Sequence, residues 1–130
     1  MKKNLLFASL LAFTASFTLF AKGDTWVFLG DRTVSFRTEN DTIPVGAHDG
    51  IFRKIKLKVT KNAIRIVDLK IHFANGDVQD VGLRSVIRAG GETRIIDLSG
   101  TQRVITKVTL RYESLNQRKG KAKVQLFARH

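Results

Sequence analysis

Apolar residues alternate with lysines from Lys54 to Thr60, and this alternation constrains the fold more than any other feature of the chain. Ile55, Leu57 and Val59 occupy the odd positions of this stretch, and lysines occupy the even positions before Thr60. Successive side chains of a β-strand point to opposite faces of its sheet, so a repeat of two residues predicts a strand that is buried on one face. The lysines of this strand are therefore expected to face solvent.

A second strand is predicted to follow directly. Lys61-Asn62, between the two strands, has the composition of a tight turn because asparagine adopts a positive φ at low cost. We therefore expect residues 51–73 to form a long central β-hairpin. In the second strand the apolar residues lie on even positions up to Ile66 and on odd positions from Val67 onward. This slip of one residue predicts a β-bulge near Ile66-Val67.

The remaining chain has the same strand-like character, with no helical period after the N-terminal segment. Turn signals at Gly30-Asp31 and Asn75-Gly76 separate some of the expected strands. Residues 38–50 are predicted to form the longest irregular loop. Further strands are predicted at residues 25–29, 32–37, 78–87, 93–98, 103–112 and 121–128. About eight strands in all predict an antiparallel β-sandwich, with a closed barrel as the alternative.

The N-terminus has the order of a secretory signal peptide. A basic pair, Lys2-Lys3, precedes the apolar or small run Leu5–Phe20, which is shorter than the ~20 residues of a transmembrane helix. We expect a signal helix over residues 1–21, cleaved after Ala21, and a single β-sandwich domain over residues 22–130. Cleavage would lower the count of Lys and Arg from 23 to 21 against 11 Asp and Glu, a net charge of +10. The expected location is the periplasm or exterior of a bacterium, and the chain contains no cysteine for a disulfide.

Four short motifs are spread over the expected domain. They are Trp26-x-x-Leu29-Gly30, Asp41-x-Ile43, Gly50-x-x-Arg53-Lys54-Ile55-x-Leu57 and Arg103-x-Ile105-x-Lys107-Val108-x-Leu110. Together they resemble a family of small exported bacterial proteins of unknown function. The resemblance implies an exported β-sandwich and carries over no activity. The last strands are also similar to those that end lectin-like and carbohydrate-binding sandwiches, a likeness that any β-sandwich can produce.

Enzyme activity is not expected. The chain has no cysteine and no G-x-S-x-G sequence, so it lacks the usual signatures of an activated nucleophile. His48, His72 and His130 are too far apart in sequence for metal-ligand spacing. No cofactor is expected.

No metal site is expected, and calcium is the one metal for which the sequence offers candidate ligands. Glu39, Asp41 and Asp49 place hard oxygen ligands within one loop, which is the ligand type that calcium prefers. Their spacing matches no EF-hand, and acidic residues of this kind also cap turns or remain solvated. A calcium-assisted carbohydrate-binding module is therefore one alternative for the function.

The basic surface carries the main functional expectation. The formal net charge of the whole chain is +12, and a broad positive face attracts polyanions. The residues expected to bind are Lys54, Lys56, Lys58, Lys70, Lys107, Arg111, Lys121 and Lys123, and the outward phase of residues 78–88 adds Arg84 and Arg88. The expected function is non-catalytic binding of an acidic polysaccharide, lipopolysaccharide or similar envelope anion, including a lipid head group.

A structural or protein–protein interaction module of the bacterial envelope is the other alternative, because lysines also protect exposed strands from aggregation. No aromatic residue is expected to be interleaved with the lysines, so base stacking is not indicated and nucleic acid is not an expected partner. No transmembrane span is expected after signal cleavage, and the oligomeric state is left open.

Overall fold

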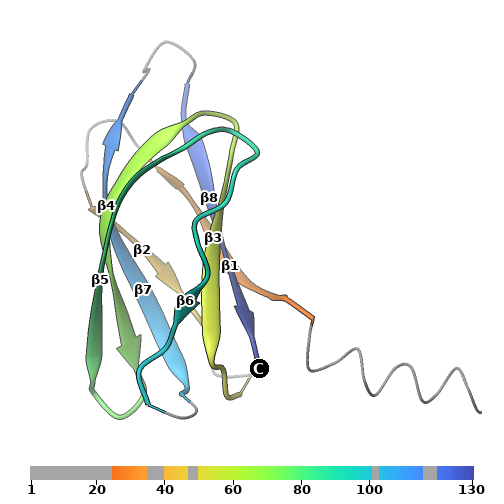
Figure 1. The fold of residues 1–130 in the computed structure, drawn as a ribbon, viewed down its shortest axis with the longest axis vertical. Coiled ribbons are helices and arrows are strands. Elements are labelled where there is room, and N and C mark those ends of the chain that lie inside the picture. The colour runs from red at the N-terminus through yellow and green to blue at the C-terminus, as the bar shows by residue number, and fades with distance from the viewer. Residues whose placement is uncertain (1–24, 35–39, 47–49, 101–102, 116–119) are drawn as a thin grey trace, which may run out of the picture.

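The structure, a computed structural model, describes residues 25–34, 40–46, 50–100, 103–115 and 120–130. The expected antiparallel β-sandwich is confirmed, and the expected signal helix lies outside the described residues (Figure 1). One sheet has the strand order β1-β8-β3-β6 and the other the order β2-β7-β4-β5. The strands are β1 (Val27–Val34), β2 (Asn40–Pro44), β3 (Lys54–Thr60), β4 (Ile64–Phe73), β5 (Val78–Ile87), β6 (Ile96–Asp97), β7 (Ile105–Ser114) and β8 (Ala122–Arg129).

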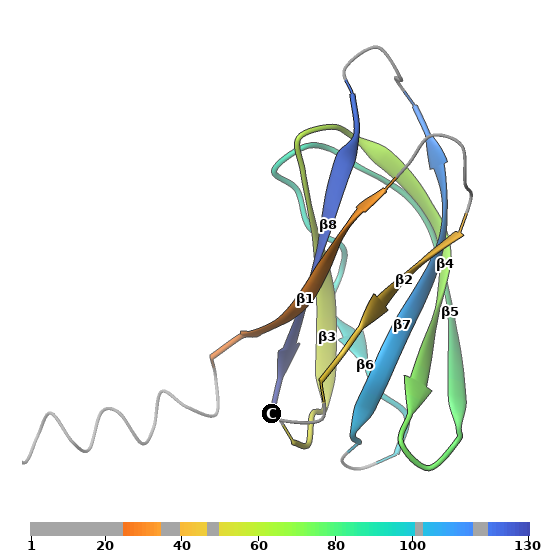
Figure 2. The same cartoon turned by 180° about the vertical axis from the view of Figure 1, so that it is seen from behind.

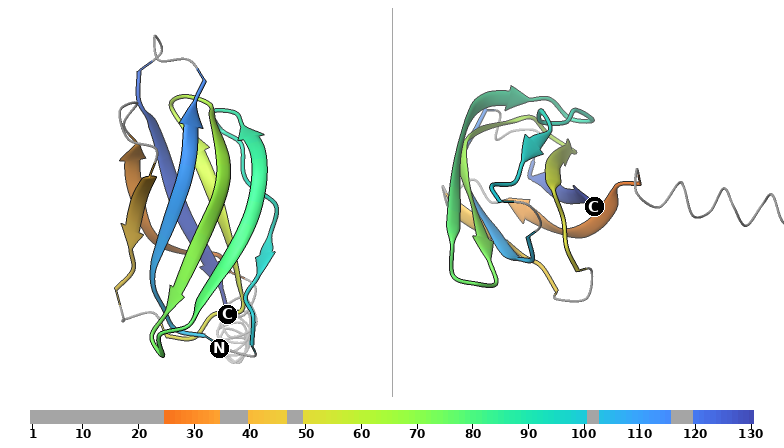
Figure 3. Two further views of the ribbon diagram at one scale, coloured as in Figure 1. Left: turned by 90° about the vertical axis from the view of Figure 1, so that its left-hand side faces the viewer. Right: turned by 60° about the horizontal axis from the view of Figure 1, so that its bottom comes forward.

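The core lies between the two sheets, which pack face to face as two layers (Figure 3). Ile55, Leu57 and Val59 of β3 are fully buried, as their alternation predicts. The same alternation runs along β8, where every second residue from Ala122 to Ala128 is buried. Burial of a large aliphatic side chain contributes about 1.5–3 kcal/mol. The two-residue repeat therefore both creates the core and leaves the opposite face of each strand in solvent.

The predicted hairpin over residues 51–73 is wrong. β3 pairs with β8 and β6, whereas β4 pairs with β5 and β7, so the chain crosses from one sheet to the other between Thr60 and Ile64. The crossing forms an arch at the upper end of the molecule in Figure 1. At this arch the buried Asn62 donates a 2.8 Å hydrogen bond to the carbonyl of Gly120 and accepts one from the amide of Ala63. Alternation sets which face of a strand is buried, and an arch and a hairpin satisfy it equally.

The predicted bulge near Ile66-Val67 is confirmed. Along β7, Ile66 pairs with Tyr112 and Asp68 with the next residue, Arg111, so Val67 is the extra residue of β4. Along β5 the same two residues pair with Ser85 and Gly82, so β5 in turn has an extra residue at the same level. The bulge therefore disturbs the pairing of β4 with both of its neighbours. The predicted hairpin turn at Asn75-Gly76 is also confirmed, and it joins β4 to β5.

The two strands at one edge of the sandwich differ from the sequence prediction. β1 continues through the predicted turn at Gly30-Asp31, because a bulge at Leu29 absorbs the change of phase. β2 lies within residues 38–50, which were expected to be irregular, and it pairs with β7. β1 and β2 belong to different sheets and run side by side at this edge (Figure 2).

The segment between β5 and β6, residues 88–95, passes over the upper end of the molecule from one sheet to the other (Figure 1). Its backbone runs beside β3: the amide of Gly90 donates to the carbonyl of Val59, and the amide of Thr93 donates to the carbonyl of Leu57. The strand predicted at residues 93–98 is reduced to the two residues of β6. The segment thus supplies β3 with hydrogen-bond partners that a longer β6 would have supplied.

Candidate functional site

The outer face of the β1-β8-β3-β6 sheet brings aromatic rings and cations together. Phe28 of β1 pairs with Phe127 of β8, and Phe127 pairs on its other side with Lys56 of β3. The two phenylalanine rings meet edge to face with their centroids 5.6 Å apart. Phe28 is 49% exposed, which is high for a large apolar side chain. We call this surface the aromatic-cationic face and define it by Trp26, Phe28, Phe127, Lys54, Lys56 and Arg129.

Trp26, just before β1, organises two of these cations. The ammonium of Lys56 lies 4.5 Å from the centroid of the Trp26 ring, and the guanidinium carbon of Arg129 lies 4.9 Å from it. Both distances are within the range of a cation–π interaction. The indole therefore holds cations from β3 and β8 in place beside Phe127.

Each of the two lysines of this face forms an ion pair with an acidic residue. Lys54 binds Asp97 of β6 at 2.6 Å, and Lys56 binds Glu92 at 3.2 Å. The hydrogen bond from Lys54, together with its charge, lowers the pKa of the exposed Asp97 carboxyl below its ordinary value. Arg129 has no ion pair within the described part of the chain. The face thus holds more positive than negative charge, with its ammonium groups oriented by partners on the sheet.

The structure divides the predicted binding residues between opposite sides of the sandwich. Lys54, Lys56, Lys58 and Lys123 lie on the outer face of the β1-β8-β3-β6 sheet, opposite the buried phase of β3 and β8, and Lys121 directly precedes β8. The other three lie on the outer face of the second sheet, namely Lys70 of β4 and Lys107 and Arg111 of β7. The eight residues therefore do not share one sheet face.

On the outer face of the second sheet, opposite charges are paired across the strands. Lys70 binds Asp80 at 2.7 Å, and Arg111 binds Asp68 at 2.9 Å. The hydrogen bond and the charge of Asp80 raise the pKa of the Lys70 ammonium above its ordinary value. Opposite charges on neighbouring strands stabilise a sheet by about 0.2–1 kcal/mol per pair. The ion pairs on this face form a structural network, and Lys107 of β7 has no ion pair within the described residues.

Every Asp and Glu among the described residues forms an ion pair with a different Lys or Arg. The pairs are Lys123–Asp31, Arg32–Asp41, Arg111–Asp68, Arg103–Asp77, Lys70–Asp80, Lys56–Glu92, Lys54–Asp97 and Arg65–Glu113. The positive excess of this part of the chain is therefore carried by the cations that remain. They are Arg53, Lys58, Lys61, Arg84, Arg88, Arg94, Lys107, Lys121 and Arg129.

Sequence reasoning missed the aromatic residues of the aromatic-cationic face. The expectation that no aromatic is interleaved with the lysines is wrong, because Phe127 lies beside Lys56 on the neighbouring strand. Phe127 follows the outward phase of β8, together with Lys123 and Gln125. The sequence did contain one indication of an exposed ring, because Phe127 occupies an outward position in a strand that alternates regularly. Only the strand order could show that it lies next to the lysine row.

The described part of the candidate calcium loop favours a structural role for Asp41. Its carboxylate accepts a 3.0 Å hydrogen bond from the Arg32 Nε and another from the hydroxyl of the buried Tyr112. These contacts tie β1, β2 and β7 together at the edge of the sandwich. Glu39 and Asp49 lie outside the described residues. Within the described residues, no three His, Asp or Glu side chains are grouped as metal ligands would be.

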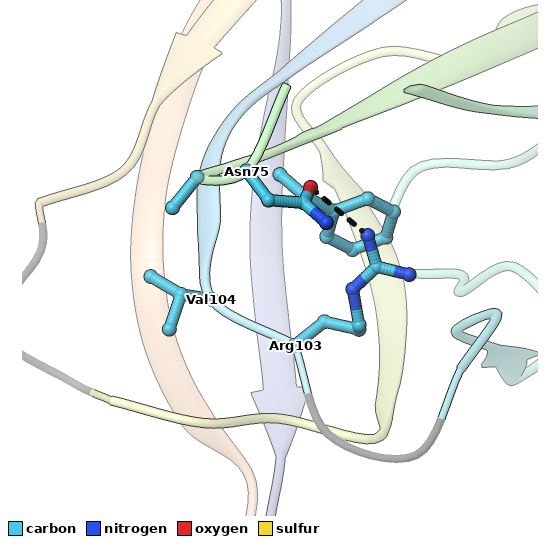
Figure 4. Close-up of a pocket in the computed structure, with 5 residues that line it drawn as sticks. Asn75, Arg103 and Val104 are labelled. Atoms are coloured by element: carbon cyan, nitrogen blue, oxygen red, sulfur yellow. Dashed lines mark hydrogen bonds between the residues drawn. The ribbon is translucent and has the colours of Figure 1, made fainter. Parts of the chain in front are cut away.

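A shallow pocket of about 180 Å³ lies at the end of the sandwich opposite the arch (Figure 4). Arg103 lines it, with its guanidinium carbon 3.9 Å from the centroid of the Phe73 ring. The same guanidinium donates hydrogen bonds to Asp77, to the Asn75 side chain and to the carbonyl of Ser99. Because Asp77 neutralises the Arg103 charge and these contacts hold its guanidinium against Phe73, the pocket fits a structural role better than an anion site.

Comparison with known proteins identifies a family and a fold. The model of a family described as a domain of unknown function (DUF2541) matches residues 5–128. A search of curated proteins finds no similar sequence. No helix of the described residues is long and apolar enough to cross a membrane.

Several solved structures resemble this chain to different degrees. AlgX of Pseudomonas aeruginosa has a TM-score of 0.51 and 11% identity over 82% of this chain, which spans only 26% of AlgX. The SPBc2 prophage-derived protein YomS has a TM-score of 0.43 and 16% identity, with 80% of this chain and 90% of YomS covered. The tobacco streak virus coat protein has a TM-score of 0.39 and 11% identity, with 81% and 85% covered. At these identities the likeness to AlgX shows a shared fold alone.

Proposed function

The chain belongs to the DUF2541 family, a domain of unknown function, and we propose that its aromatic-cationic face binds an acidic polysaccharide. The binding is non-catalytic. The proposal includes export to the periplasm or exterior of a bacterium, which the signal-like residues 1–21 support. Acidic polysaccharides of the cell envelope are the polyanions that a protein exported there encounters.

One observation carries the proposal: the exposed Phe28 and the half-buried Phe127 lie beside cations on a single sheet face. Phe28 and Phe127 offer apolar ring surface on which the CH groups of a sugar ring pack. Arg129, held against Trp26 and without an ion pair among the described residues, offers charge to a carboxylate. Neighbouring strands are about 4.8 Å apart, so the face from β1 to β3 is about 10 Å wide. The phenylalanine rings and the cationic side chain thus lie close enough together to contact the same short stretch of a polysaccharide chain.

Binding to polygalacturonate tests this function. Its methyl-esterified form is the matched ligand control, since it keeps the sugar ring and loses the charge. We expect the protein to bind the acid form more tightly, and we expect Phe28→Ala to weaken binding about tenfold, or ~1.4 kcal/mol. The variant Lys70→Met is the matched protein control, because Lys70 lies on the opposite outer face. Isothermal titration calorimetry measures both affinities.

Four results would contradict the proposal. Equal affinity for the two forms of the polymer would remove the role of charge. Equal losses in Phe28→Ala and Lys70→Met would remove the role of this face. Tighter binding of a single-stranded oligonucleotide than of polygalacturonate would assign the rings to base stacking instead. An absence of binding to all of these polymers would favour a protein-interaction module.

A further inference from the structure

Unpaired cations gather at the arch between β3 and β4, apart from the aromatic rings of the aromatic-cationic face. We call them the arch cluster and define it as Lys58, Lys61, Arg84, Arg88 and Lys121. Within the described part of the chain none of them has an acidic partner. They are five of the nine described cations that have no ion pair, so they carry much of the net positive charge of the described residues.

Strand pairing and backbone contacts place the members of the cluster toward one end of the sandwich. Arg84 is three residues before Ile87, which pairs with Ile64 at the start of β4. The Asn62 side chain donates a 2.8 Å hydrogen bond to the carbonyl of Gly120. Lys61 precedes Asn62 and Lys121 follows Gly120, so this bond brings the two lysines to the same part of the arch. On the other side, Gly90 donates a 2.7 Å hydrogen bond to Val59, which brings the turn that starts at Arg88 next to the end of β3.

The backbone at Lys61 and Arg84 gives a second, independent observation. Their φ angles are +74° and +48°, and they are the non-glycine residues with positive φ in the part of the chain that the structure describes. A residue with a Cβ is strained in this region, and glycine adopts it without cost. Strained positions of this kind cluster at functional sites. Both strained positions carry an unpaired cation of the arch cluster.

The local charge and chemistry indicate the kind of ligand. Among the described residues, the acids near this end are Asp31, Glu92 and Glu113, and Lys123, Lys56 and Arg65 bind them. Arginine and lysine without neighbouring rings recognise phosphate by charge and by hydrogen bonds. Several cations at one end of the sandwich fit several phosphate groups better than a single one.

We infer that the arch cluster binds a ligand with clustered phosphate groups, at a site separate from the aromatic-cationic face. The inference rests on the arch itself and holds whether or not the proposed polysaccharide function is correct. A soluble polyphosphate and a membrane rich in phosphate monoesters both present this chemistry.

The double variant Lys61→Gly/Arg84→Gly tests the inference. Glycine removes both cations and also relieves both positive-φ positions, so we expect the melting temperature to hold or rise. We expect the affinity for inorganic polyphosphate to fall about tenfold or more. A loss of binding in a variant of unchanged or higher melting temperature is a result that misfolding does not produce. Unchanged affinity would overturn the inference.

The double variant Arg53→Gln/Lys107→Gln is the matched control. It removes the same charge from two exposed cations that have no ion pair among the described residues and that lie outside the arch cluster. We expect it to bind polyphosphate as the unmodified protein does. Equal losses in the two double variants would show that net charge alone attracts the polyanion, and would also overturn the inference.

Two further arms separate the sites and the sources of phosphate. Phe28→Ala is expected to retain polyphosphate binding, so a failure of the polysaccharide proposal leaves this result intact. Sedimentation with phosphatidylcholine vesicles, with and without phosphatidic acid, tests a membrane source. Binding to either probe that the arch variant loses supports the site, and binding to neither overturns it.

Discussion

The amide of Leu57 donates a 3.0 Å hydrogen bond to the side-chain hydroxyl of Thr93, and the carbonyl of Leu57 accepts one from the Thr93 amide. A threonine in the segment between β5 and β6 therefore satisfies both backbone groups of a buried β3 residue. Its hydroxyl also donates to the carbonyl of Arg94. Residues 88–95 thus complete the hydrogen bonding of β3 where β6 is too short to reach.

Replacing Thr93 with valine tests this contact. Valine keeps the shape of the side chain and removes the acceptor of the buried Leu57 amide, which costs about 1–3 kcal/mol. We expect urea denaturation to show a loss of this size. Thr93→Ser, which retains the hydroxyl, is the control and is expected to lose less. A valine variant as stable as the serine variant would contradict the assigned role of the hydroxyl.

Gly30 lies where the two sheets approach at the β1–β2 edge. A Cβ at this position would stand 3.0 Å from the carbonyl oxygen of Pro44 and 3.2 Å from the Ile43 side chain. We expect Gly30→Ala to lower the free energy of unfolding by about 1–3 kcal/mol, because β1 and β2 must separate. Gly82→Ala is the control, since a Cβ there meets nothing within 4 Å. Thermal denaturation of the two variants should differ clearly in midpoint.

The Tyr112 hydroxyl donates a 3.0 Å hydrogen bond to the Asp41 carboxylate, which also binds Arg32. Tyr112→Phe keeps the buried ring and removes this bond. We expect a loss of about 0.5–1.5 kcal/mol in the free energy of unfolding. The midpoint of guanidinium denaturation measures this loss. An unchanged midpoint would show that the Tyr112 ring stabilises the core and that its hydroxyl does not contribute.

The pKa of Asp97 is lowered below its ordinary value of 3.8, chiefly by the hydrogen bond from Lys54 and by the charge of that lysine. A lowered folded-state pKa means that this pair stabilises the protein at pH values above 3.8. The contribution is lost as the pH falls through the folded-state pKa. We expect an NMR titration of the Asp97 carboxyl to show a midpoint below 3.8, which moves up in Lys54→Met. A midpoint that does not respond to this substitution would rule out Lys54 as the cause.

Lys70 shows the opposite direction of shift. Its pKa is raised above 10.5, chiefly by the hydrogen bond to Asp80. A raised folded-state pKa means that the pair contributes fully below pH 10.5 and that the contribution disappears as the pH rises through the folded-state pKa. We expect Asp80→Asn to lower the Lys70 pKa in an NMR titration of the side-chain ammonium. Because both groups are exposed, the accompanying change in stability is expected to be small.

The fold was largely predictable from alternation and turn chemistry. The buried phase of β3 and β8, the bulge at Val67 and the turn at Asn75-Gly76 all follow from local sequence. β2 was not predicted, because its five residues include Pro44 and only one fully buried position, Ile43. A strand this short is held by its pairing with β7, which is a tertiary contact.

The candidate sites were predictable only in part. The lysine row of β3 faces solvent as expected. Its aromatic neighbours come from β1 and β8, which are distant in sequence, so no pattern within β3 points to them. The arch cluster likewise depends on the contact of Asn62 with Gly120, across 58 residues of sequence.

The sequence by itself determined which residues of each strand are buried, because the two-residue repeat of a strand is a local property of the backbone. It also determined the net positive charge. The tertiary structure decided which strands are neighbours. That choice sends β3 and β4 into different sheets and separates Lys56 from Lys70. Pairing of the strands is set by packing of the whole core and by the Asn62 and Thr93 contacts, which join segments that local patterns cannot relate.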